Sequence, residues 1–345
     1  MKNKKVSFLV LIVALSLVLY FTLKDDFSGI THNLSKVNII LFVIAILVFI
    51  ISLLLKSVSL NLFIKDYKKD YGLLKSFKLI LISQFLNGVT PFQTGGQPFE
   101  IYILRKDGIR ISDSTSAILK DFISYQISLI LVGLFAIIIN HDLNFIEYNK
   151  LINLLLIFGF LINVLVLVFI ILIVNAKLVV IKLTKKLFGF FGRFKIMNKV
   201  IFLEDNVLKG LDNFYSAGND MKKDKVKLFK AILCNIASLL LLYIIPFIVY
   251  VSLNAKNITL LNSIVSVSFV MIIGNFIPIP GATGGVEYSF LQFFGTFIKN
   301  PVLSSGMLLW RFITYILGMI IGFIALILDK RILNKKERSI LIEKW

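Results

Sequence analysis

Four ionisable side chains lie in or beside apolar stretches of this sequence, where charge is costly: Glu100, Asp121, Glu287 and Arg311. An ionisable residue near the membrane interior marks either a functional site or an internal ion pair. An arginine holds a phosphate through its planar fork of donors, while a carboxylate can meet a cationic group or a coupling proton. Lys120, directly before Asp121, is a further candidate. The sequence therefore predicts a polar site for an anionic headgroup, with pairing among these charges as the alternative.

A hexapeptide pattern, Pro-x-x-Thr-Gly-Gly, occurs twice, at residues 91–96 and 280–285. Proline removes a backbone donor and a glycine pair disfavours helix, so each copy is expected to break a helix. Broken backbone at membrane depth is tolerated only where it is buried in protein or lines a cavity. Paired breaks in corresponding halves of a transporter point to its binding site. Each break is therefore expected to lie at the substrate-binding site.

A helix that starts after each glycine pair would aim its positive end and its free amides at an anion. This adds the residues of the two hexapeptides to the candidate charges. The predicted substrate-binding residues are Thr94, Gly95, Gly96, Glu100, Asp121, Pro280, Thr283, Gly284, Gly285, Glu287 and Arg311.

The composition is that of an integral membrane protein. Of the 345 residues, 58% are hydrophobic, and the mean hydropathy is +0.89. Soluble domains average about 45–50% apolar residues. A net charge of +19 would suggest nucleic acid in a soluble protein. Here the basic residues lie mostly between apolar runs, which indicates cytoplasmic loops that face anionic membrane lipids, so no nucleic-acid partner is expected.

Redox and metal chemistry find little support in the sequence. Cys234 is the only cysteine, so a disulfide within the chain is impossible and a redox centre is not expected. His32 and His141 stand far apart in separate polar connections, which is not a metal-ligand pattern. The sequence predicts no metal site, no cofactor and no catalytic residue.

Six apolar runs are long enough to cross roughly 30 Å of hydrocarbon as helices. They are Val6–Leu23, Val37–Leu55, Ile118–Asn140, Leu151–Val174, Ala231–Leu253 and Val302–Leu328. Two further runs, Tyr71–Leu104 and Asn262–Ile298, contain the hexapeptides. Basic residues flank the first of these on both sides and are few around the second, so the positive-inside rule makes them two re-entrant hairpins that enter from opposite faces. The predicted fold is all-α, with an inverted repeat and both termini in the cytoplasm.

The connections between the spans carry most of the basic residues. The second span is expected to end at Leu55, which places Lys56 in a basic cytoplasmic loop. The segment 182–195 mixes basic and aromatic residues and predicts either an interfacial helix or a solvated connector. The expected organisation is one polytopic membrane domain at 1–330, with halves at about 37–140 and 231–328, a basic cytoplasmic loop at 175–230 and a short cytoplasmic tail at 331–345.

Both motif regions resemble a known family. The first signature is Asn87-Gly-Val-Thr-Pro-Phe-Gln-Thr-Gly-Gly-Gln-Pro-Phe-Glu100, followed by Leu104, Gly108 and Asp121. The second is Gly274-Asn-Phe-Ile-Pro-Ile-Pro-Gly-Ala-Thr-Gly-Gly-Val-Glu287, followed by Arg311 and Tyr315. They are similar to the transmembrane region of lysylphosphatidylglycerol synthases, the flippase-like domain of multiple peptide resistance factor. The resemblance covers nearly the whole chain and implies re-entrant helices and movement of aminoacylated phospholipid between leaflets.

The favoured function is therefore a lipid flippase or lipid-handling transporter of the plasma membrane, acting on a phospholipid with a polar, anionic or aminoacylated headgroup. Full-length members of that family add a soluble domain that transfers lysine from charged tRNA to phosphatidylglycerol, so a phosphatidylglycerol lysyltransferase linked to cationic peptide resistance is one alternative. The loop 175–230 is too small for such a domain, so that activity is expected to need a partner chain. A separate acyltransferase or glycosyltransferase is the expected partner type. A scaffold for envelope lipid synthesis is the second alternative.

Overall fold

The computed structural model describes residues 27–143, 150–191 and 200–329, and within these ranges the chain is helical, without strands. Five helical segments are long and apolar enough to cross a membrane. They are α3 (Ile39–Ile64), α6 (Ile111–Leu143), α7 (Lys150–Asn175), α10 (Lys225–Ser252) and the composite helix Val302–Ile327. The all-α multi-pass architecture is thereby confirmed. The first predicted span, Val6–Leu23, and the tail 331–345 lie outside the described residues.

The long helices present apolar side chains outward, as lipid-facing helices do. On α7, for example, Leu154, Leu161, Leu165 and Phe169 are each at least half exposed. A soluble protein rarely leaves so large a contiguous apolar surface in water. The polar and charged side chains of the spans, in contrast, turn inward. The packing therefore has the inside-out polarity expected where hydrocarbon replaces water as the solvent.

One boundary prediction was wrong, and it matters for the site. The second span was expected to end at Leu55, but α3 continues to Ile64, so Lys56 lies within the helix. The segment 56–64 contains neither proline nor glycine, and its polar residues are accommodated by burial against neighbouring helices rather than by solvent. Lys56 stands eight residues before the helix ends, which is roughly 12 Å of helix.

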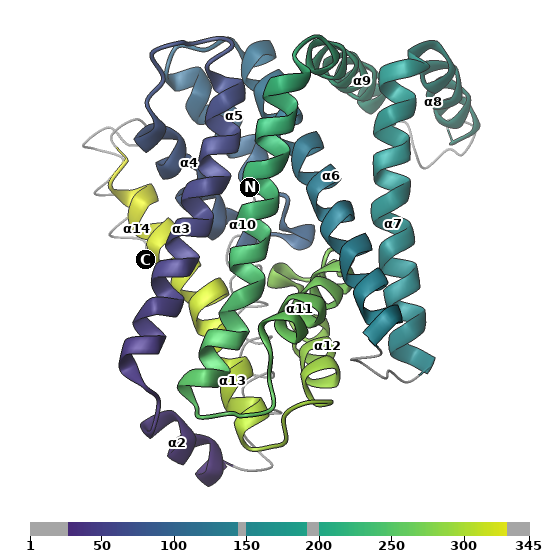
Figure 1. The fold of residues 1–345 in the computed structure, drawn as a ribbon. Helices are drawn as coiled ribbons and strands as arrows, with labels where there is room; N and C mark the ends of the chain where they lie inside the picture. The colour runs from purple at the N-terminus through teal and green to yellow at the C-terminus, as the bar shows by residue number, and fades with distance from the viewer. Residues whose placement is uncertain (1–26, 144–149, 192–199, 330–345) are drawn as a thin grey trace.

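The two hexapeptides break helices, as predicted. The first hairpin runs from α4 (Leu73–Gly88) through the 3-10 turn η1 (Pro91–Gln93) to α5 (Gly96–Lys106), and the second from α11 (Leu260–Gly274) through η3 (Pro280–Ala282) to α12 (Gly285–Phe294). Figure 1 shows α4 and α5 in the upper half of the molecule and α11 and α12 in the lower half. The hairpins thus approach the centre from opposite ends of the bundle.

The turns share a backbone conformation at the two residues after each proline and differ at the threonine and the first glycine. The two residues after each proline have positive φ: Phe92 and Gln93 at 54° each, Gly281 at 63° and Ala282 at 52°. In each turn the threonine amide donates to the proline carbonyl at 3.4 Å. The threonine hydroxyl donates to that same carbonyl, at 3.1 Å in the first turn and 2.7 Å in the second. The repeated sequence therefore gives a repeated turn at the proline end of each hexapeptide, but not at its Thr-Gly end.

The tips of the two hairpins meet. The turns η1 and η3 are in contact, and the last span ties them together, because the Tyr315 hydroxyl donates to the Gly88 carbonyl at 3.0 Å. The Tyr315 ring also lies so close to Gly281 that a Cβ there would be 2.4 Å from it. Outside the tips, α4 packs on α14 (Gly318–Ile327), while α11 packs on α6 and α7. Each hairpin is therefore held by spans from the other half of the chain.

The basic connection after α7 is helical where the structure describes it. It contains α8 (Lys177–Phe191) and α9 (Val200–Lys223), both at the upper end in Figure 1, while the short helix α2 (Phe27–Ser35) lies at the lower end. The described part of the predicted interfacial segment, 182–191, is thus helix despite its glycine at 189. Its place on a membrane surface stays a prediction.

Candidate functional site

Arg311 and Glu287 form a buried ion pair in the second half. Glu287 lies in the first turn of α12, and Arg311 is the last residue of α13 (Val302–Arg311). The arginine donates from Nε to Oε1 of Glu287 at 2.6 Å, and its Nη2 lies 2.6 Å from the same oxygen in the ion pair. The side chains are only 12% and 8% exposed, respectively. The two sequence-predicted charges that follow the second break are therefore each other's partners.

The pair is also joined to the break itself. Nη2 of Arg311 donates to the Gly281 carbonyl at 3.1 Å, and the Gly284 amide donates to the second oxygen of Glu287 at 2.6 Å. Gly284 has a φ of 91°, which favours glycine and aims its amide at the carboxylate. The first turn of α12 thus holds an internal carboxylate where the sequence predicted a substrate anion. An anion that binds Arg311 there must displace the Glu287 carboxylate from the guanidinium.

Aromatic rings and a change of helix type surround Arg311. Its guanidinium lies 5.6 Å from the Trp310 ring and 5.1 Å from the Tyr315 ring. Trp310 is fully buried and stacks on Phe290 at 4.5 Å. Directly after Arg311 the backbone forms a π-helical segment, Phe312–Leu317, before it returns to α-helix in α14. Single π turns inside helices occur frequently at functional sites.

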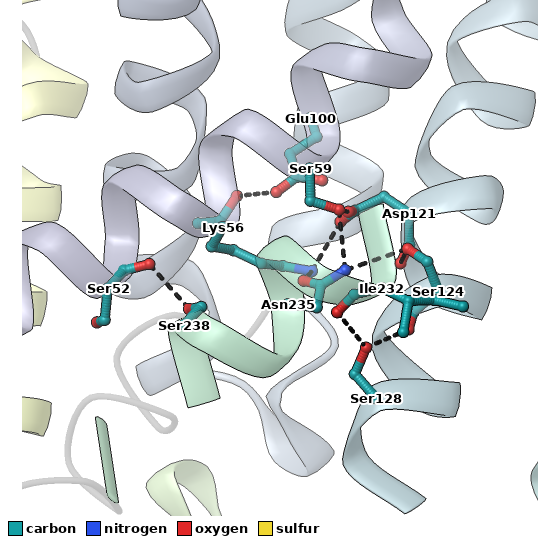
Figure 2. A network of polar contacts seen from close by, with 11 residues as sticks. Ser52, Lys56, Ser59, Glu100, Asp121, Ser124, Ser128, Ile232, Asn235 and Ser238 are labelled. Atoms are coloured by element: carbon teal, nitrogen blue, oxygen red, sulfur yellow. Dashed lines mark hydrogen bonds and ion pairs between the residues drawn. The ribbon is translucent and has the colours of Figure 1, made fainter. Parts of the chain in front are cut away.

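A second buried network occupies the first half, shown in Figure 2. The Lys56 ammonium donates to Oδ2 of Asp121 at 2.8 Å and to Oδ1 of Asn235 at 3.1 Å, while the Ser59 hydroxyl donates to Oδ1 of Asp121 at 2.6 Å. The Asn235 amide donates to the hydroxyls of Ser59 and Ser124 at 2.8 and 3.1 Å. The network joins α3, α6 and α10, and its polar atoms satisfy one another. A Lys–Asp salt bridge is thus held inside the bundle, with the two side chains 22% and 10% exposed.

Glu100 lies at the edge of this network without joining its ion pair. It is buried, and its Oε1 accepts from the Ser83 hydroxyl at 2.5 Å. Lys56 attracts the Glu100 carboxyl electrostatically and Asp121 repels it. Among the described residues, no salt bridge reaches Glu100. Glu100 therefore adds a second buried carboxyl to a site that has one lysine.

The two post-break glutamates play different parts because their spacing from the glycines differs. Glu287 follows Gly285 by two residues and reaches back to the start of its helix, whereas Glu100 follows Gly96 by four residues and cannot. In the first hairpin the Gly96 amide instead donates to Oδ1 of Asn87 at 2.8 Å. Asn87 therefore satisfies a backbone amide that the break frees. Both hairpins therefore contain the helix break, but only in the second does the glutamate cap the helix that follows.

Of the predicted site residues, the structure groups some and separates others. Glu100 and Asp121 lie in the first network, and Glu287, Gly284 and Arg311 lie in the second. Lys120 belongs to neither: its ammonium meets Asp66 at 3.2 Å and the Tyr67 hydroxyl at 3.1 Å. The threonine hydroxyls stabilise their own turns, and the first break is exposed while Pro280 and Thr283 are buried. The remaining candidates, Gly95, Gly96 and Gly285, form the starts of α5 and α12.

Sequence reasoning missed Lys56, Ser59, Ser83 and Asn235. Lys56 was assigned to a loop because a lysine that follows an apolar run is also what the positive-inside rule predicts. A signal was nevertheless present, since Ser57, Ser59 and Asn61 recur at every second position after it in otherwise apolar sequence. Within the described residues, His, Cys, Asp and Glu side chains form no cluster that could hold a metal ion.

This architecture defines a class of multi-pass helical membrane protein with two broken hairpins and buried charged networks. The sequence matches the family described as the lysylphosphatidylglycerol synthase TM region over residues 7–322. The chain belongs to this family. It is also similar to a UPF0104 membrane protein of Methanocaldococcus jannaschii, with 26% identity over 280 residues, which are 76% of each chain.

Proposed function

We propose that this protein is a lipid flippase of the plasma membrane, which binds the polar headgroup of a phospholipid beside the meeting tips of its hairpins and moves the lipid between leaflets. The observation that carries the proposal is the buried Arg311–Glu287 pair beside the second break. A phosphate that competes for the guanidinium could accept from two of its donors through two oxygens, whereas the carboxylate meets them through Oε1 alone. Glu287 would remain held by the Gly284 amide and could then accept an ammonium group of the same headgroup.

The proposed topology makes both hairpins re-entrant, as parts of an inverted repeat. Basic residues gather where α3, α5 and α9 end, which the positive-inside rule assigns to the cytoplasm. The first hairpin then enters from the cytoplasmic face and the second from the outer face, with the C-terminus in the cytoplasm. The matching turn conformations support a repeat, and the contact between the tips supports a shared central site.

The first-half network gives this site a second, independent charge pair. Lys56 and Asp121 lie between spans that pack on one another, and Glu100 brings the first hairpin beside them. Buried ionisable groups in membrane proteins mark substrate or ion pathways more often than they contribute stability. We assign Glu100 and Asp121 to the headgroup path, with Lys56 as the cation that pairs with Asp121.

A vesicle assay tests the proposal. Purified protein is reconstituted into liposomes with fluorescent phosphatidylglycerol, and a membrane-impermeant quencher reports how much lipid changes leaflet. We expect wild type and Arg110→Ala to move lipid, because Arg110 is exposed and pairs only locally with Asp113. Arg311→Ala should abolish movement. Movement at wild-type rate in Arg311→Ala would refute the assignment.

The alternatives are separated in the same vesicles. Addition of lysine-charged tRNA, followed by analysis of the extracted lipids, tests lysyl transfer by this chain. Lysyl-lipid formation without leaflet exchange would favour the lysyltransferase, and the absence of both activities would favour the scaffold for envelope lipid synthesis. Addition of a separate soluble acyltransferase or glycosyltransferase then tests for a catalytic partner.

A further inference from the structure

A pocket of about 360 Å³ lies between the α10–α11 and α12–α13 connections. Lys256, Asn257, Lys299 and Asn300 supply its polar lining, and apolar lining comes from neighbours such as Phe297. Both connections lie at the lower end of Figure 1, opposite α8 and α9. The pocket is separate from both buried networks described above, since it shares no residue with them.

The two lysines of this pocket have no acidic partner in the part of the chain that the structure describes. Between Lys225 and Leu328 the sequence has one acidic residue, Glu287, and that carboxylate is bound to Arg311. Lys256 and Lys299 are exposed and form no salt bridge with any residue that the structure describes. Two lysines thus line one pocket without a carboxylate partner among the residues that the structure describes. Such an arrangement favours an external anion.

A helix start adds to this positive potential. Val302, the first residue of α13, also lines the pocket, and the preceding Pro301 gives no side-chain cap. The Leu303 amide of this first turn donates to the Lys299 carbonyl at 3.1 Å, so the helix contributes the positive end of its dipole beside the pocket rather than a set of free amides. The nearby start of α11 differs, because Thr259 caps it by accepting from the Asn262 amide at 3.1 Å. Of these two helix starts, only that of α13 lacks a side-chain cap.

We propose that this pocket binds the phosphate group of an anionic phosphoester. Two lysines and a helix start suit a compact, doubly contacted anion, and the apolar lining beside them suits a ligand with an attached hydrocarbon part. Val302 and Arg311 are the two ends of α13, so the pocket lies roughly 14 Å along one helix from the central arginine. Its role as an outer waiting position for the headgroup rests on the proposed flippase function, whereas phosphate binding does not.

Binding is measured by calorimetry on the full chain in neutral detergent, with two probes: inorganic phosphate and the soluble short-chain lipid dihexanoylphosphatidylglycerol. We expect the double variant Lys256→Gln/Lys299→Gln to bind at least about tenfold more weakly than wild type. The Lys256→Arg/Lys299→Arg variant should retain binding, and wild-type affinity should fall as salt rises. Lys36→Gln is the matched control, because Lys36 is an exposed lysine that follows α2 at the same end.

The probes also identify the source of the phosphate. Tight binding of the lipid alone assigns the pocket to a headgroup, and equal binding of inorganic phosphate assigns it to free phosphoanions. Equal affinity of wild type and the double glutamine variant for the probes overturns the proposal. An equal loss of affinity in Lys36→Gln, or no binding of either probe to wild type, also overturns it. Vesicle transport is measured in parallel. If Arg311→Ala loses transport while the double glutamine variant binds phosphate as wild type does, the pocket proposal is refuted and the flippase function is not. If wild type binds phosphate in the pocket but moves no lipid, the flippase function is refuted and the pocket proposal is not.

Discussion

Removal of the Arg311–Glu287 pair, one partner at a time and then together, distinguishes a binding site from an internal support. Arg311→Met leaves the Glu287 carboxylate with the Gly284 amide as its one remaining partner and removes the donor of the Gly281 carbonyl. Glu287→Gln removes one of two oxygens that both have partners, so either the cap or the contact to Arg311 is lost. Each single change leaves a buried group of the pair without its charge partner.

The burial of the pair sets the size of the effect. Because the side chains are only 12% and 8% exposed, loss of one partner should cost about 3–5 kcal/mol of unfolding free energy. In a chain of this size that should lower the midpoint of thermal unfolding by about 5–10 °C. The double variant Arg311→Met/Glu287→Gln removes both charges while the new amide oxygen can still accept from Gly284. It should therefore recover most of the lost stability.

The assay combines thermal unfolding in detergent with lipid movement in vesicles for wild type, both single variants and the double variant. We expect the double variant to unfold near the wild-type midpoint and to move no lipid, because the guanidinium that would hold the phosphate is absent. Arg311→Lys should fold normally and transport slowly, since it keeps the charge but loses the fork of donors. If the double variant instead recovers transport along with stability, the pair is structural support and Arg311 is not the phosphate ligand.

Three further predictions follow from the fold. Lys56→Met should destabilise the protein by about 3–5 kcal/mol, measured by thermal unfolding, because it leaves the buried Asp121 carboxylate without its charge partner. Almost no change would mean that Lys56 behaves as a surface lysine without a partner. Gly281→Ala should impair transport more than Gly108→Ala, since both have positive φ but only at Gly281 would the new Cβ strike the tyrosine that joins the tips; equal effects would mean backbone strain alone. In a background whose native cysteine is replaced by serine, a cysteine at Lys299 should react with an impermeant maleimide from outside, and one at Lys106 only after permeabilisation; external labelling at Lys106 would contradict the re-entrant first hairpin.

The sequence alone determined the class of the protein and the position of its breaks. Long apolar runs make membrane helices because hydrocarbon leaves no other partner for backbone amides, so five spans could be read from hydropathy. Proline and glycine act locally, within one or two turns, so both hexapeptides could be recognised as breaks without knowledge of their neighbours. The charges Glu100, Asp121, Glu287 and Arg311 were likewise recognisable, because an ionisable residue in or beside an apolar stretch is unusual whichever partner it later finds.

Which charges pair with which was decided by tertiary structure. Asn235 is nearly 180 residues from Ser59 and 111 from Ser124, yet its amide joins both, because α3, α6 and α10 pack side by side. Lys56 has the same sequence context as a loop lysine, and only the position of Asp121 across the helix interface makes its burial favourable. Side-chain contacts between helices depend on helix rotation and depth, and periodicity in one sequence does not fix these for two helices at once.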